Sequence, residues 1–104
     1  MNVLKHVDNH MDDLILDLQK LIQQPSVSAK NEGIEECAKL VKKLLKSSGV
    51  KSEILRLKKG VAPIVFGEIK SKSNPGKTLM FYNHYDVQPA EPFDLWDDPP
   101  FSGV

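Results

Sequence analysis

Residues 78–89 read TLMFYNHYDVQP and carry the strongest local signal of the sequence. Its first half, Thr78–Asn83, is a compact apolar run, typical of a strand that is covered on both faces of its sheet. His84 follows directly, at the carboxyl end of the predicted strand, where ligands gather in α/β sheets. The stretch therefore predicts a buried strand with a polar site at its end.

Two amphipathic helices are expected upstream of this strand. Apolar residues recur at steps of three and four over residues 4–24 and again over residues 32–47. Pro25 is expected to end the first helix, because proline lacks the amide hydrogen that a helix needs. Asn31 is expected to cap the start of the second helix and Gly49 to end it.

Two further strands are expected between these helices and the apolar run. Residues 50–57 alternate imperfectly between apolar and polar, and residues 62–69 carry β-branched and aromatic side chains. An Asn-Pro-Gly turn lies within residues 71–77. Residues 84–104 hold four of the seven prolines and are expected to form an irregular loop. The order helix, helix, strand, strand, strand predicts a layered α/β domain.

Length and composition narrow the class of protein. The 104 residues suit one small domain, and 40% hydrophobic residues are too many for a disordered chain. No apolar run approaches the about 18 residues of a membrane span, and the first residues carry acids where a signal peptide needs an apolar core. The single cysteine, Cys37, excludes an internal disulfide and is expected to be buried in the second helix. We expect a cytoplasmic protein that is not bound to a membrane.

The charges are divided unevenly along the chain. Residues 1–77 hold all 14 Lys and Arg against 9 acids, whereas residues 78–104 hold 5 acids and no Lys or Arg. Nucleic acid is therefore a poor partner, because the aromatic residues are not interleaved with basic ones. Six of the seven aromatic residues lie in the acidic segment, namely Phe81, Tyr82, Tyr85, Phe93, Trp96 and Phe101. An acidic segment that contains a histidine favours a metal site.

The candidate site is the pair His84 and Asp86. In extended backbone, residues two apart point to the same side, so the two side chains can approach each other. A carboxylate beside a metal-binding histidine selects its tautomer and raises its basicity. The spacing alone leaves another interpretation open, in which His84 is an ordinary residue at a strand end and Asp86 begins a turn.

A family resemblance favours the metal site. Residues 79–103, LMFYNHYDVQPAEPFDLWDDPPFSG, resemble the first metal-ligand motif of the zinc-dependent metallopeptidases and deacylases. That family includes aminoacylase, carboxypeptidase G, acetylornithine deacetylase, succinyl-diaminopimelate desuccinylase and the carnosine-type dipeptidases. The motif is a His-x-Asp-Val-x-Pro core followed by Trp96 and Pro99-Pro100-Phe101, and its form is most similar to the dipeptidase branch. Residues 21–28, LIQQPSVS, resemble the family's helix-to-loop signature, so the likeness spans nearly the whole chain.

The resemblance implies roles for both residues of the pair. His84 would be a zinc ligand, and Asp86 would orient its imidazole by a contact with the ring nitrogen that does not bind zinc. The family hydrolyses an amide bond of a small peptide or an N-acyl amino acid at a centre of two zinc ions, with a glutamate as general base.

The family's remaining ligands match no residue of this chain. The bridging aspartate, the paired glutamates and the later ligands all fall beyond the position that matches Val104. The resemblance thus implies the N-terminal part of a catalytic domain, as a shortened product or the product of an interrupted gene. Since a catalytic zinc normally needs three protein ligands, we expect these residues alone to be inactive.

Two other possibilities remain at this point. His6 and His10 have the helical spacing of a metal clip that would include Asp13, but Val7 stands where a zinc-protease helix carries Glu, which favours a fraying first turn. Alternatively, the chain is a non-catalytic module whose tail binds a partner through Phe93, Trp96 and Phe101. In either role, an apolar strand at residues 78–83 should not remain exposed at a sheet edge, so we expect self-association or a homo-oligomer.

Overall fold

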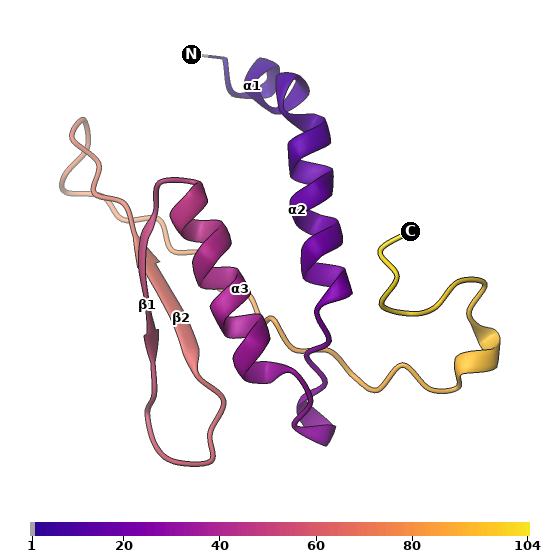
Figure 1. The fold of residues 1–104 in the computed structure, drawn as a ribbon. Coiled ribbons are helices and arrows are strands. Elements are labelled where there is room, and N and C mark those ends of the chain that lie inside the picture. The colour runs from indigo at the N-terminus through magenta and orange to yellow at the C-terminus, as the bar shows by residue number, and fades with distance from the viewer. Residues whose placement is uncertain (1) are drawn as a thin grey trace.

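A helix packed on a two-stranded antiparallel sheet forms the centre of the computed structural model, which describes residues 2–104 (Figure 1). The helix is α3 (Ile34–Ser47), and the strands are β1 (Lys51–Leu55) and β2 (Ile64–Glu68). The strands pair in register from Lys51↔Glu68 to Leu55↔Ile64. The predicted α/β class is confirmed, because helix and sheet form two layers.

Helix α3 begins two residues later than expected. Its first turn is preceded by Gly33 at φ 69°, while Asn31, the expected cap, lies in the left-handed region at φ 50° without capping the helix. A Cβ atom at Gly33 would lie 1.9 Å from the backbone oxygen of Pro25. The chain therefore turns into α3 at a place that only glycine can occupy. The helix ends as expected, with Gly49 at φ 81°.

The first predicted helix, residues 4–24, is interrupted at His10. The structure has α1 (Val3–Asn9) and α2 (Met11–Gln23) instead of one helix. The His10 ring places Nδ1 2.8 Å from the backbone oxygen of His6, and the His10 amide bonds to Val7. The ring thus takes the oxygen that the amide would use in a continuous helix, which is the physical reason for the break. No helix within residues 2–104 is long and apolar enough to cross a membrane.

The third predicted strand is not formed. Residues 78–83 pair with no other strand, and the side chains of Leu79 and Tyr82 are 80% and 87% exposed. The prediction of a strand covered on both faces is therefore wrong for this structure. A strand needs a neighbour that completes its hydrogen-bond ladder, and residues 2–104 place none beside this run.

The last segment, residues 84–104, is irregular apart from one short 3₁₀ turn at Phe93–Leu95. It returns to α2, so that the C-terminus lies beside this helix (Figure 1). Gln19 and Gln23 of α2 donate side-chain hydrogen bonds to the backbone oxygens of Gly103 and Ser102, at 2.9 and 3.0 Å. The tail is thus attached to the helical part of the molecule.

Much of the apolar surface has no partner. The radius of gyration is 16.3 Å, against about 13 Å for a compact domain of this length. The exposed area is 9054 Å², against about 5,900 Å² for a compact monomer of this mass. The hydrophobic core of the described chain is small and consists of Val27, Ile34, Cys37 and Ala38. The chain therefore exposes surface that a self-contained domain would bury.

Candidate metal site

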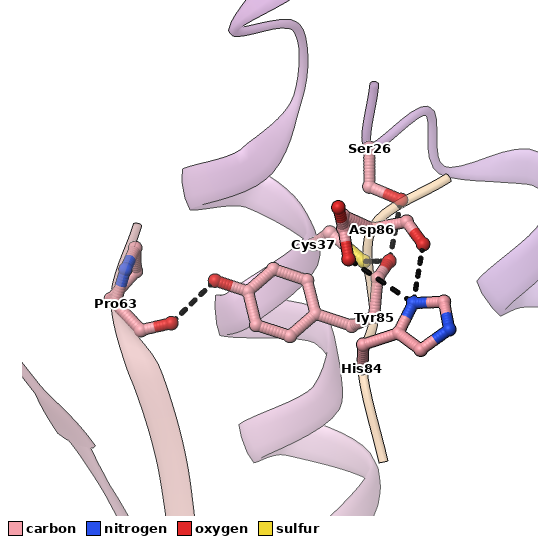
Figure 2. Close-up of polar contacts among 6 residues, drawn as sticks. All are labelled: Ser26, Cys37, Pro63, His84, Tyr85 and Asp86. Carbon is pink, nitrogen blue, oxygen red and sulfur yellow. Dashed lines mark hydrogen bonds and ion pairs between the residues drawn. The ribbon is translucent and has the colours of Figure 1, made fainter. Parts of the chain in front are cut away.

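His84 and Asp86 form the contact that their spacing predicts. The Nδ1 atom of His84 lies 3.1 Å from a carboxylate oxygen of Asp86 and 2.9 Å from the backbone oxygen of the same residue (Figure 2). Because both partners are acceptors, the neutral imidazole that fits these contacts carries its hydrogen on Nδ1 and its lone pair on Nε2. The side chain of His84 is 77% exposed. The imidazole therefore turns a free nitrogen toward the surroundings.

Asp86 is suited to accept this hydrogen bond. A hydrogen bond from the Ser28 side chain lowers the pKa of the Asp86 carboxyl below its usual 3.8, and the contact with His84 lowers it further. The carboxyl is therefore ionised at neutral pH and accepts hydrogen bonds only. Its negative charge also favours a cation bound on the other side of the imidazole.

The backbone of this site is attached to the loop after α2. The hydroxyl of Ser26 donates to the backbone oxygen of Tyr85 at 2.7 Å (Figure 2). The amide of Val87 donates to the backbone oxygen of Ser26 at 2.9 Å. Val27 and Val87 form an isolated parallel bridge beside these bonds. The Sγ atom of Cys37 lies 3.8 Å from the same oxygen of Tyr85. Residues 85–87 are thus fixed from one side by the loop and α3.

Tyr85 connects the site to the sheet. Its hydroxyl donates a 2.6 Å hydrogen bond to the backbone oxygen of Pro63, directly before β2 (Figure 2). Burial raises the pKa of the Tyr85 phenol, so the group is a neutral donor. Since neighbouring residues of extended backbone point to opposite sides, the anchored ring of Tyr85 leaves His84 facing away from the sheet.

The remaining sequence candidates do not join this pair. The rings of His6 and His10 stack on each other with centroids 4.2 Å apart in the first helical turns. Cys37 is 2% exposed, and burial raises the pKa of its thiol, so the expected buried cysteine is confirmed. Within residues 2–104, no group of three His, Cys, Asp or Glu residues lies close enough to hold a metal.

A metal therefore fits one part of this site. The free Nε2 atom of His84 has the chemistry of a zinc ligand, and the carboxylate behind it completes the usual arrangement. A tightly held catalytic zinc needs about three protein ligands, and the described residues bring no three candidate ligands together.

The sequence reasoning missed the residues that fix the site. The sequence pattern marks Ser26 only as part of the helix-to-loop signature at residues 21–28, and it marks Tyr85 only as an aromatic residue of the acidic segment. Lys30 also reaches the tail, where it forms an ion pair with Glu91. The available signal for Tyr85 was its position between His84 and Asp86, which places it on the opposite side of the backbone. For Ser26 and Lys30 the signal is absent, because their partners lie about sixty residues away.

The aromatic tail is ordered and half exposed. Trp96 donates from Nε1 to the backbone oxygen of Ala90 at 2.8 Å, and its side chain remains 52% exposed. Phe93 is 57% exposed. The tail therefore offers aromatic surface, while its path is set by hydrogen bonds within the chain.

Comparison with known proteins adds an independent line of support. No family model matches the chain. The chain is 37% identical over 92 residues to the succinyl-diaminopimelate desuccinylase of Blochmanniella pennsylvanica, a match that covers 88% of this chain and 23% of that protein. It is 30% identical over 111 residues to the Cys-Gly metallodipeptidase dug1 of Schizosaccharomyces pombe, covering 92% of this chain and 22% of that protein.

A solved structure shows the same likeness. The crystal structure of an M20 family metallo-carboxypeptidase from Sulfolobus solfataricus matches with a TM-score of 0.71 and 42% identity, over 82% of this chain and 19% of that one. The chain thus spans about a fifth of the length of the proteins it matches.

Proposed function

Since this chain belongs to the M20 family of metallopeptidases and deacylases, we propose that it forms part of a catalytic domain that hydrolyses an amide bond with bound zinc. The observation that carries the proposal is the His84–Asp86 contact, which leaves Nε2 free. In this proposal, His84 is a zinc ligand and Asp86 orients its ring. Two bound zinc ions would polarise the amide carbonyl and lower the pKa of a bound water.

The proposed substrate is a dipeptide or an N-acyl amino acid. The names of the relatives support this class, because one is a dipeptidase and another removes a succinyl group. A free buried thiol at Cys37 is compatible with a reducing compartment, and we propose the cytoplasm. The proposal includes no role in binding nucleic acid or a membrane.

Residues 1–104 by themselves are proposed to lack hydrolytic activity. One zinc ligand binds the ion weakly and leaves the general base unprovided. A hydrolysis assay with a dipeptide, an N-succinyl amino acid and added Zn²⁺ should therefore show no turnover above buffer. Turnover by the purified chain that is lost in His84→Ala would contradict this part of the proposal.

A metal titration tests the role of His84 directly. In ¹⁵N NMR spectra, added Zn²⁺ should shift the Nε2 resonance of His84 more than its Nδ1 resonance. His84→Ala should remove this response, whereas His6→Ala, which changes the exposed histidine of α1, should leave it intact. Zn²⁺ that shifts only the resonances of His6 and His10 would overturn the assignment of His84 as a ligand.

Self-association is proposed alongside this function. The apolar run at residues 78–83 and the excess exposed area of about 3,000 Å² support it, because a standard interface needs only about 800 Å² per partner. Sedimentation should show association that increases with protein concentration. A well-folded monomer at every concentration would contradict the proposal.

A non-catalytic interaction module is the second candidate function. It is supported by the exposed aromatic surface of Phe93 and Trp96. In that case Trp96→Ala should weaken binding of a partner, while His84→Ala should not. A protein that loses its metal response in His84→Ala and is unaffected by Trp96→Ala would favour the hydrolase.

A further inference from the structure

We propose that Ser26 is a positioning residue for His84 and acts through the backbone of residues 85–87 and the side chain of Asp86. The inference uses the proposed function only in treating Nε2 of His84 as the ligand atom. The proposed effect of Ser26 is on the orientation of the His84 imidazole, which can be measured without metal or substrate.

Burial first marks Ser26 as unusual. Ser26 is 4% exposed. The other buried residues of the described chain are apolar. A hydroxyl loses its hydrogen bonds to water when it is buried, so it must be satisfied within the protein. The Tyr85 oxygen at 2.7 Å supplies this partner. Removing the hydroxyl would leave that oxygen short of a strong donor.

Ser26 forms hydrogen bonds with the residues on both sides of Asp86. The side chain reaches the residue before Asp86, and the backbone oxygen accepts from Val87, the residue after it. The peptide groups on both sides of Asp86 therefore have fixed orientations. These same peptide groups determine where the backbone oxygen of Asp86 lies, and they carry its carboxylate, which also accepts the hydrogen bond from Ser28. Both the backbone oxygen and the carboxylate meet Nδ1 of His84.

The imidazole depends on this arrangement because little else orients it. The His84 side chain is 77% exposed, and its hydrogen bonds within the described chain are the two to Asp86. If residues 85–87 relax, Nδ1 loses both acceptors, and the tautomer with hydrogen on Nε2 becomes available. That tautomer has no lone pair on the nitrogen that faces away from Asp86.

Cys37 is too weak to replace Ser26. Its sulfur lies 3.8 Å from the same Tyr85 oxygen, and a thiol is a poor donor. The hydroxyl of Ser26 is therefore the strong side-chain donor that fixes this peptide group.

Metal-free NMR of the full chain at neutral pH tests the inference. In the unmodified protein, the ¹⁵N shifts of His84 should report hydrogen on Nδ1, and the Val87 amide should be protected from hydrogen exchange. In Ser26→Ala, His84 should become a mixture of tautomers, and exchange at Val87 should rise about tenfold. Unmodified protein with hydrogen on Nε2 of His84 would overturn the inference without any variant.

Two control variants separate positioning from stability. Ser47→Ala removes a hydroxyl that donates to the backbone oxygen of Leu44 at the exposed end of α3. Ile34→Val reduces packing at the buried start of α3 without touching the hydroxyl. Neither should change the tautomer of His84. A change as large in Ile34→Val as in Ser26→Ala would mean that loss of stability alone moves the ring, which would overturn the inference.

The outcome is independent of the metal titration. If Zn²⁺ fails to shift His84 in the unmodified protein, the proposed ligand role fails, while the tautomer measurement still decides the role of Ser26. If Ser26→Ala leaves the tautomer and Val87 exchange unchanged, the positioning role fails even where zinc binds.

Discussion

Residues 78–83 and residues 84–87 are adjacent in the chain but differ in how the structure supports them. The apolar run is exposed, with Phe81 at 81%, and takes part in no strand. The polar segment that follows is bound to the loop after α2 and to Pro63 through short hydrogen bonds. The difference shows that a few directed polar contacts position the site, while the apolar run requires a partner surface that residues 2–104 do not supply.

Gly33→Ala should have the largest effect on stability, because it should free residues 84–87 from the loop after α2. A Cβ atom there would lie 1.9 Å from the Pro25 backbone, at a positive φ, so the loop that holds Ser26 must change shape. We expect a loss of about 2–4 kcal/mol in the free energy of unfolding, measured by urea denaturation. Gly76→Ala is the control, because open space surrounds that glycine. Equal stability of the two variants would contradict this account of the loop.

Phe81→Lys should weaken the proposed self-association. A charge within the apolar run opposes its burial, so the dissociation constant of the assembly should rise about tenfold or more. Leu57→Lys is a matched control, because Leu57 is 72% exposed in the loop between β1 and β2. Sedimentation at several concentrations measures both. An equal effect of the two substitutions would show that general surface charge, and not residues 78–83, controls association.

Gln19→Ala should loosen the end of the supported region. The amide of Gln19 donates to the backbone oxygen of Gly103 at 2.9 Å, and its loss should cost about 0.5–1.5 kcal/mol locally. Faster hydrogen exchange at the amides of residues 101–104 would report this change. Lys20→Ala is the control, because Lys20 pairs only with Asp17 of the same helix among the contacts of the described chain. Unchanged exchange in Gln19→Ala would mean that the tail is attached by other contacts.

The pH dependence of stability should contain a small contribution from Glu35. Hydrogen bonds from Arg56 lower the pKa of the Glu35 carboxyl below its usual 4.5 in the folded protein. The contribution is therefore present above pH 4.5 and is lost as the pH falls through the lower folded value. Arg56→Met should reduce the change in the free energy of unfolding with pH over this acidic range. Near neutral pH, the dependence of that free energy on pH should be the same as in the parent protein. A steeper loss in acid than in the parent protein would contradict the assigned sign.

The sequence predicted the parts of the fold that depend on local patterns. The apolar spacing of residues 32–47 and the glycine at position 49 predict a helix and its end, and both are present, with the helix beginning at Ile34. The break at His10 was missed, because it arises from a ring that reaches the backbone one turn earlier. The prediction of a strand at residues 78–83 was wrong. An apolar run indicates that a segment tends to be buried, but it cannot supply the neighbouring strand that the segment needs.

The residue pattern alone predicts the candidate metal-binding chemistry: a histidine and an aspartate two residues apart, after an apolar run, in an acidic segment that resembles a metal-ligand motif. The folded chain is needed to show that Nδ1 of His84 faces Asp86 and that Ser26 bonds to the peptide group before Asp86. The physical reason is distance along the chain. Spacing of two residues is encoded by the geometry of extended backbone, whereas a hydroxyl at position 26 reaches position 85 only when the whole fold brings them together.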